Sequence, residues 1–311
     1  MTMRGKLLVT GGGGMVGRNI LEHPLAREWD LLAPARSELD LTDFRAVGAF
    51  FEKERPAAVI HAAGRVGGIQ ANMAHPVDFL VQNTDIGRNV ILAARGAGVE
   101  HLINVASSCM YPREAHNPLT EDLLLKGELE PTNEGYALAK IFSTRLCEYI
   151  RRESPSLRYK TLIPCNLYGR HDKFAPEHSH LVPAIIHKMH LAKASGAETV
   201  EVWGDGSARR EFMYAGDLAE ATLRALVEID SIPDEMNVGL GHDHSINDYY
   251  TIAAKVMGWE GHLVHDLTKP VGMKQKLVSI ERQSAWGWSP KTTLEQGIGL
   301  AYRYYTKEYK L

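Results

Sequence analysis

The feature that most restricts the fold of this chain is a run of glycines close to its start. Residues 11–14 are all glycine; they follow the apolar run at residues 6–9 and precede the apolar stretch at residues 15–21. Glycines at a turn from a strand into a helix are typical of dinucleotide-binding folds. The pattern therefore predicts a cofactor loop, although four consecutive glycines also fit a merely flexible loop.

The residues of this loop have distinct predicted roles. Gly11 is expected to allow the tight turn, Gly14 the close approach of backbone to a pyrophosphate, and Gly17 the packing of helix on strand. Met15 and Val16 open the predicted helix. The first N–H groups of a helix lack partners within it and attract anions, so we expect the pyrophosphate there.

Strand-like and helix-like stretches alternate along the first half of the chain. The predicted strands are residues 6–9, 30–33, 58–61, 102–105 and 160–163, and the predicted helices are residues 15–21, 42–55, 76–98 and 133–152. This alternation predicts an α/β fold, a Rossmann-like doubly wound parallel sheet covered on both faces. Ligands bind beyond the carboxyl ends of the strands in such sheets, where the glycines lie.

The pattern changes after residue 168. Helices are predicted at residues 181–194, 218–229, 247–257 and 294–305, and a strand at residues 200–203. We expect residues 1–168 to form a dinucleotide-binding domain and residues 169–311 mainly a smaller C-terminal α/β substrate lobe. Segments near residues 211–240 are expected to return to the first domain.

Composition narrows the class of protein. The formal charge is −3 for 311 residues, without a long basic run, which argues against nucleic acid or a membrane surface as partner. No stretch approaches the ~18 apolar residues of a membrane helix and no apolar signal segment opens the chain, so we expect a cytoplasmic protein. The three cysteines lack Cys-x-x-Cys spacing, which predicts neither a disulfide framework nor a metal site.

Tyr136 and Lys140 are the strongest pointer to chemistry. They stand four residues apart in a predicted helix, so both side chains share one face. An ammonium there would lower the pKa of the phenol and make the tyrosine a general acid for a carbonyl oxygen that receives hydride. Taken alone, the pair also fits an ordinary surface helix; the glycine loop favours the catalytic interpretation.

These residues resemble those of a known family, the extended short-chain dehydrogenase/reductases. The shared motifs are Thr10-Gly-x-x-Gly-x-x-Gly17, Ser107-Ser-Cys109, the Tyr136/Lys140 pair and Asn166-Leu-Tyr-Gly169. Within that family the chain is similar to the GDP-L-fucose synthases and the related GDP-L-colitose synthases. The distinctive segments are Val66-Gly-Gly-Ile-Gln-Ala-Asn72, Ser107-Ser-Cys-Met-Tyr-Pro112, Glu130-Pro-Thr-Asn-Glu134, His178-Ser-His180, Trp203-Gly-Asp-Gly206 and Arg210-Glu-Phe212.

The resemblance implies an NADPH-dependent epimerase/reductase of a GDP-4-keto-6-deoxy-hexose. Protons beside the carbon 4 ketone are acidic because their removal gives an enolate, so inversion needs a base, an acid and oxyanion donors. The resemblance assigns the first two roles to Cys109 and His180, the third to Ser107 with Tyr136, and reduction to Tyr136 and Lys140. Without it, Cys109 is a buried structural cysteine and His180 a surface or capping histidine.

The cofactor implied is NADP(H). Relatives place it against Gly11, Gly14, Met15, Val16, Gly17, Arg36, Asp40, Leu41, Ala62, Asn83, Lys140 and Asn166. NAD enzymes carry an acid after the second strand for the ribose hydroxyls, whereas the segment Ala33-Pro-Ala-Arg36 has none and ends in a base suited to a 2′-phosphate. A solvated loop arginine remains the alternative for Arg36.

The resemblance also implies the substrate contacts. Arg210 would hold the diphosphate with help from Lys276, while Ser108, Asn166 and Trp203 would lie near the sugar or base. An arginine suits a diphosphate because its planar fork donates two parallel hydrogen bonds. Lys276 fits a solvated charge equally well, and the neighbouring Arg209 is expected to be solvated.

Several alternatives remain open from the sequence. Carbon 3 of the substrate bears a hydroxyl in the fucose type and none in the colitose type, and the same catalytic residues would serve both. A reductase without epimerisation, a redox-neutral NAD epimerase and a non-enzymatic Rossmann sensor are the rivals. The resemblance further implies a homodimer formed through the helix bearing Tyr136 and its predecessor.

Overall fold

A six-stranded parallel sheet forms the centre of the larger part of the molecule. The computed structural model describes residues 3–175, 179–269 and 273–309. The strands lie in the order β10-β5-β4-β3-β1-β2, and every neighbouring pair is parallel. Their bounds are β1 Lys6–Thr10, β2 Asp30–Leu32, β3 Ala58–His61, β4 His101–Val105, β5 Arg158–Pro164 and β10 Glu235–Val238.

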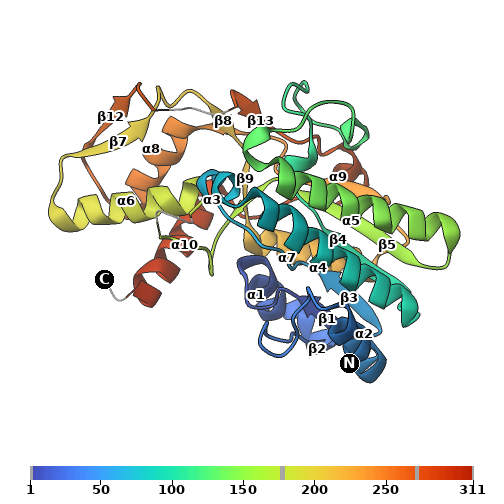
Figure 1. Cartoon of the computed structure of the whole chain (residues 1–311). Helices are drawn as coiled ribbons and strands as arrows, with labels where there is room; N and C mark the ends of the chain where they lie inside the picture. Colours follow the sequence, from blue (N-terminus) through green and yellow to red (C-terminus); the bar gives the residue numbers. More distant parts are fainter. Residues whose placement is uncertain (1–2, 176–178, 270–272, 310–311) are drawn as a thin grey trace.

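Helices cover both faces of this sheet (Figure 1). The helices α1 (Met15–Glu22) and α7 (Ala215–Val227) pack on each other, and α4 (Pro76–Gly96) packs between α2 (Phe44–Glu54) and α5 (Glu134–Glu153). Successive residues of a strand face opposite sides. Accordingly Leu7 and Val9 join the apolar cluster with α1 and α7, whereas Leu8 joins the cluster with α2 and α4. The predicted Rossmann-like doubly wound sheet is confirmed.

A second group of elements lies to the left of the sheet in Figure 1 and has its own apolar cluster. Its helices are α6 (Leu181–Ser195), α8 (Ile246–Met257) and α10 (Leu294–Tyr309). Three small sheets accompany them: β7 (Thr199–Trp203) with β12 (His262–Asp266); β8 (Arg209–Arg210) between β11 (His244–Ser245) and β13 (Gln275–Lys276); and β6 (Asn166–Tyr168) with β9 (Phe212–Tyr214). The division into two domains with these exact limits stays a prediction.

The longer elements match the sequence-based prediction closely, and several short ones were missed. β3 has the predicted bounds, and α6 is one residue longer than predicted. The helix predicted at residues 218–229 begins three residues earlier, at Ala215. Most of the missed elements have too few residues to show a period, although β10 and β12 are as long as the predicted β3 and β7. They are the helices α3 (Ile69–Ala74) and α9 (Glu281–Ala285), the 3-10 turns η1 (Pro24–Glu28), η2 (Ser108–Met110), η3 (Glu121–Leu123) and η4 (Pro131–Asn133), and the strands β6 and β8–β13.

One buried carboxylate joins the second group of elements to the sheet. Glu211, 1% exposed, follows Arg210 and accepts hydrogen bonds from the N–H groups of Leu240, Gly241 and Val278 at 2.6, 3.1 and 2.9 Å. Burial raises its pKa to about 7, although the three donors act in the opposite direction. Glu211 thus ties the segment after β8 to the loop after β10 and to the chain beyond β13.

Candidate active site

The glycine loop has the shape that the sequence predicts. Gly11 has φ +74°, and a methyl group placed on it would lie 2.8 Å from Ala63 Cα. A methyl group on Gly17 would lie 2.2 Å from Gly11 O, so the first turn of α1 packs directly on the loop. Gly14 is the N-cap residue of α1 and no side chain caps the helix, which leaves its first N–H groups to a ligand.

The loop lies at the point where the strand order reverses. β1 has β2 on one side and β3 on the other, and this is where doubly wound sheets bind dinucleotides. Ala62 follows β3 directly, at the same edge of the sheet as the glycine loop. Arg36 is exposed in the turn after β2. The pKa of Asp40 is lowered mainly by its hydrogen bonds with Thr42, and the charge of Arg36 lowers it further. Leu41 accepts a 2.9 Å hydrogen bond from Asn89 Nδ2 through its backbone oxygen.

Asn83 fixes the loop after β3 through its side-chain amide. Its Oδ1 accepts from Arg65 N at 2.7 Å, and its Nδ2 donates to Arg65 O and Phe79 O at 3.2 and 2.7 Å. A methyl group on the neighbouring Gly64 would lie 3.0 Å from Asn83 Oδ1 and 3.7 Å from Lys140 Nζ. Asn83 therefore holds this loop against the lysine predicted to be catalytic.

Tyr136 and Lys140 lie together on α5, but the predicted lowering of the phenol pKa is wrong for the free protein. Lys140, 6% exposed, donates to Val105 O at 3.0 Å, and its Nζ lies over the Tyr136 ring, 5.8 Å from the centroid. Burial raises the pKa of Tyr136 and lowers that of Lys140 to about 8. Desolvation is the main cause of the higher Tyr136 pKa, and the charge of Cys109 raises it further.

Cys109 lies in the 3-10 turn η2, which follows β4. Ser107 caps the turn, and its Oγ accepts a 3.3 Å hydrogen bond from Cys109 N. Burial raises the pKa of the Cys109 thiol, while Lys276, Ser107 and Lys140 act to lower it. The thiol in turn raises the pKa values of Tyr136 and Lys140, so the three groups share one electrostatic environment. Ser108, which stands between Ser107 and Cys109 in the chain, is only 2% exposed.

His180 is the N-cap residue of α6, and its pKa is lowered by burial and by the charge of Lys173. His178 of the same motif lies outside the described residues. The motif at residues 66–72 lies against the segment before His180: Lys173 Nζ donates to Val66 O at 3.3 Å, and a methyl group on Gly68 would lie 3.6 Å from Ser179 O. Sequence reasoning missed Lys173, which no motif marked.

The predicted substrate residues occupy two places. Asn166 Nδ2 donates to Glu211 O at 3.2 Å, next to Arg210, and Lys276 lies opposite Arg210 in the paired strands β13 and β8. Trp203, 48% exposed at the end of β7, donates to Glu201 Oε1 at 2.9 Å and has Lys269 over its ring. The structure thus groups Asn166, Arg210 and Lys276 and places Trp203 at an outer edge.

Arg209 is exposed to solvent, as expected, but it also pairs with a buried carboxylate. Its Nε pairs with Asp243 Oδ1 at 2.6 Å and its Nη2 donates to Asp243 O at 2.8 Å. Asp243 is 9% exposed, so the arginine neutralises a buried carboxylate. The two adjacent arginines therefore differ: Arg209 serves the packing of β8 against β11, and Arg210 stays near Lys276.

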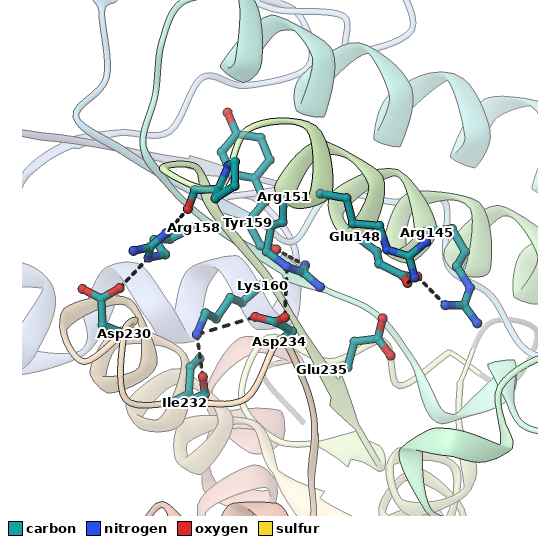
Figure 2. Close-up of polar contacts among 12 residues, drawn as sticks. Arg145, Glu148, Arg151, Arg158, Tyr159, Lys160, Asp230, Ile232, Asp234 and Glu235 are labelled. Atoms are coloured by element: carbon teal, nitrogen blue, oxygen red, sulfur yellow. Dashed lines mark hydrogen bonds and ion pairs between the residues drawn. The ribbon is translucent and has the colours of Figure 1, made fainter.

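A charged hollow of about 420 Å³ lies at the opposite end of the sheet, where β10 begins. Figure 2 shows ion pairs among its side chains, Arg151 with Asp234 at 3.4 Å and Arg145 with Glu148. Lys160, which does not line the hollow, also approaches Asp234 at 3.8 Å. These ion pairs join α5 and β5 to the segment before β10. Because the charges compensate one another, we assign this hollow no ligand.

Comparison with known proteins agrees with the fold. The profile of the NAD dependent epimerase/dehydratase family matches residues 7–239. The chain belongs to this family. Among the described residues no helix is long and apolar enough to cross a membrane, and no group of three or more His, Cys, Asp or Glu is placed to hold a metal ion.

This chain is similar to nucleotide-sugar enzymes along nearly its whole length. It is 48% identical to the GDP-L-colitose synthase of Yersinia pseudotuberculosis over 97% of this chain and 98% of the relative. It is 49% identical to the GDP-L-fucose synthase of Azorhizobium caulinodans, over 96% of each chain. Its fold matches a solved GDP-mannoheptose C4 reductase from Campylobacter jejuni with NADP bound, with a TM-score of 0.89 at 31% identity, over 98% of this chain and 99% of that one.

Proposed function

We propose that the protein is an NADPH-dependent epimerase/reductase of a GDP-4-keto-6-deoxy-hexose. The observation that carries the proposal is the shared environment of Cys109, Tyr136 and Lys140. Reduction of the ketone requires only the tyrosine and the lysine. A base beside them would also remove a proton next to the same ketone and so allow epimerisation. The relatives named GDP-L-fucose synthase and GDP-L-colitose synthase support this substrate class.

The residues present fit NADP(H). The pyrophosphate fits the place beyond the carboxyl ends of β1 and β3, where the Gly11 turn leads into the uncapped N-terminus of α1. The solved C4 reductase of similar fold binds NADP. When bound, the cofactor supplies hydride to carbon 4. Lys140, buried below the loop after β3, is assigned to the nicotinamide ribose.

The proposed chemistry has two stages. In the first, the Cys109 thiolate removes the proton beside the ketone and His180 returns one from the opposite face, while Ser107 and Tyr136 donate hydrogen bonds to the enolate oxygen. In the second, Tyr136 protonates the carbon 4 oxygen as it is reduced. Because burial keeps the phenol protonated, a proton is present on Tyr136 when the oxygen needs it.

The nucleotide part of the substrate is assigned to the other group of residues. Arg210 is proposed to bind the diphosphate, and Asn166, held by Glu211 O, the sugar. Trp203 presents an exposed ring at the outer edge, which suits stacking on the base. The nearly buried Ser108 acts through the turn it shares with Ser107 and Cys109.

The deciding experiment is incubation of the purified protein with NADPH and each GDP-4-keto sugar, with and without a hydroxyl at carbon 3, followed by NMR of the product. We expect consumption of NADPH and an L-configured 6-deoxy sugar. The substrate turned over distinguishes the fucose from the colitose type. A product with carbon 5 unchanged would favour the simple reductase, and turnover without NADPH consumption the redox-neutral epimerase.

The tyrosine assignment predicts a specific loss. Tyr136→Phe should lower the rate of reduction by ~100-fold or more, the range of a lost general acid. Tyr149→Phe is the matched control, since Tyr149 lies exposed on the same helix. Stopped-flow absorbance of NADPH measures both, and near wild-type reduction by Tyr136→Phe would remove the tyrosine from the mechanism.

The cysteine assignment predicts that the two stages separate. Cys109→Ala should lose solvent-deuterium incorporation at carbon 5, and at carbon 3 where it bears a hydroxyl, more severely than direct reduction of the ketone. His180→Asn, which cannot cycle a proton near neutral pH, should also impair inversion while it binds cofactor normally. Cys147→Ala, another buried thiol, is the control. Deuterium wash-in at wild-type rates in both active-site variants contradicts the assignment.

The position of Arg36 in the turn after β2 predicts the cofactor preference. Its charge should favour the 2′-phosphate, so kcat/KM should be higher with NADPH than with NADH. Arg36→Ala should narrow that ratio, and Arg27→Ala, in the turn η1 before β2, should not. Equal ratios in the wild type and Arg36→Ala would show that another group selects the cofactor.

We propose further that the protein is a homodimer formed through α4 and α5. Their outer faces expose Val77, Val81, Leu138 and Phe142 by 70, 49, 40 and 39%. These apolar side chains lie on two helices that pack side by side, so together they offer a surface that a second copy could cover (Figure 1). Such a two-fold contact uses the same patch on both copies.

A charged side chain introduced on this surface should dissociate the proposed dimer. Phe142→Glu should shift the protein towards monomer in sedimentation velocity, because the carboxylate would be buried in the interface. Leu191→Glu on α6, where Leu191 is 48% exposed, is the control and should leave the species unchanged. A monomeric wild type, or a dimer insensitive to Phe142→Glu, contradicts this interface.

A further inference from the structure

Phe79 is an aromatic residue of α4 whose ring meets that of Tyr136. The side chain is 2% exposed, and its ring centroid lies 6.5 Å from the Tyr136 centroid with an angle of 79° between the two planes. Nearly perpendicular rings at this distance attract each other edge to face. Because α4 and α5 pack side by side, this pair joins the first turn of one helix to the first turn of the other.

Two further groups hold the Phe79 ring. The guanidinium carbon of Arg65 lies over it, 5.2 Å from the centroid, and Arg65 Nη1 pairs with Asp78 Oδ2 at 2.9 Å. A cation above an aromatic face is attracted by the partial negative charge of that face. A methyl group on Gly67 would lie 3.1 Å from Phe79 Cζ, so the motif at residues 66–72 packs directly on the ring. Together these contacts leave the ring little space in which to move.

The side-chain amide of Asn83 holds the backbone of both Arg65 and Phe79. Its Nδ2 donates to Phe79 O at 2.7 Å and to Arg65 O at 3.2 Å, and its Oδ1 accepts from Arg65 N at 2.7 Å. Asn83 is 5% exposed, so these bonds are largely shielded from water. The loop after β3 and the start of α4 therefore form one unit that lies against Tyr136.

Tyr136 is held differently from two other tyrosines of the same part of the molecule. The hydroxyl of Tyr159 donates to Val99 O at 2.9 Å. The hydroxyl of Tyr111 donates to Asn237 Oδ1 at 2.5 Å. Within the part of the chain that the structure describes, no residue forms a hydrogen bond with the Tyr136 hydroxyl. A general acid needs that hydroxyl for its substrate, so the direction of the phenol has to come from contacts of the ring.

We propose that Phe79, held by Arg65, is a positioning residue for reduction: its ring fixes the direction in which Tyr136 presents its hydroxyl to the carbon 4 oxygen. This inference rests on the proposed function for the acid role of Tyr136. Loss of the Phe79 ring would leave the tyrosine and Lys140 in place on α5 but allow the phenol to tilt. Misplacement of a reacting group slows the chemical step without weakening the binding of substrate or cofactor.

The first test is the rate of reduction in Phe79→Leu, which keeps an apolar side chain and removes the ring. We expect kcat to fall about tenfold, while KM for the GDP-4-keto sugar and the affinity for NADPH stay at their wild-type values. Phe51→Leu is the matched control, since Phe51 is 1% exposed in the apolar cluster with α2 and α4. It removes an equally buried ring, so it should lower the temperature of unfolding and leave kcat unchanged.

A double variant distinguishes positioning from a general loss of structure. If Phe79 acts through the phenol, Phe79→Leu should slow reduction no further once Tyr136→Phe has removed the hydroxyl. If it acts only by stabilising the fold, the two losses multiply, as they do for independent sites. Multiplied losses, or a wild-type kcat in Phe79→Leu, overturn the inference.

Arg65 provides a second variant, which leaves the buried ring in place. Arg65→Met removes the cation above Phe79 and keeps a side chain of similar length, so kcat should fall about threefold. Arg65→Lys, which can keep the cation and the pair with Asp78, should restore most of the rate. These variants carry the test if Phe79→Leu does not fold, because the Arg65 side chain is 33% exposed. A wild-type kcat in Arg65→Met overturns the role of Arg65.

A measurement without substrate separates this inference from the proposed function. In protein labelled with 3-fluorotyrosine, the fluorine resonance that disappears in Tyr136→Phe belongs to this tyrosine, and its chemical shift follows ionisation of the phenol. Burial raises the pKa of Tyr136. Removal of the Phe79 ring should admit water and move this titration to lower pH, whereas Phe51→Leu should not move it.

The two kinds of measurement have distinguishable outcomes. If no GDP-4-keto sugar is turned over but the titration moves in Phe79→Leu and not in Phe51→Leu, the packing of Phe79 on Tyr136 stands and the substrate assignment fails. If sugars are turned over while kcat and the titration of Phe79→Leu match those of Phe51→Leu, the positioning role fails and the enzyme assignment stands. Thermal unfolding and NADPH binding confirm that each variant folds.

Discussion

The hydrogen bond from Lys140 Nζ to Val105 O, 3.0 Å long, is the contact on which the arrangement of the candidate site depends. It draws an ammonium that is 6% exposed to the carboxyl end of β4, below the loop after β3. An ammonium in such a place is costly, and the cost appears as a pKa lowered to about 8. Every ionisable group nearby is then governed by desolvation as much as by its charged neighbours.

This explains why the expectation for Tyr136 was wrong while its position was right. The four-residue spacing on a helix correctly placed both side chains on one face. The direction of the pKa shift depends on how much water the surrounding segments exclude, and these include α4, whose Phe79 ring meets Tyr136 edge-on, and the turn η2 that bears Cys109. Burial of this kind arises from segments distant in sequence, and no local pattern records it.

Local sequence patterns predict helices and strands but not the contacts between distant segments. The fold was therefore largely predictable, and the site only partly. The bounds of β3 and the long helices follow from apolar periodicity, which is local, and the glycine turn follows from the steric needs of Gly11 and Gly17. The pairing of Lys276 with Arg210 joins residues far apart in the chain through β13, a strand too short to show any pattern. Motifs identified the candidate residues, and tertiary packing decided which of them meet.

Electrostatics also bears on the order of the two proposed stages. A charged Cys109 raises the pKa of Tyr136, because a thiolate and a phenolate placed close together in a poorly solvated site repel each other. Ionisation of one group therefore disfavours ionisation of the other. Tyr136 is the stronger acid when Cys109 is protonated. In the proposed reaction Cys109 is protonated once it has taken a proton from the sugar and the enolate has received one from His180. Tyr136 is then freed from the charge that held its proton back, so epimerisation first and reduction second is the order that the site favours.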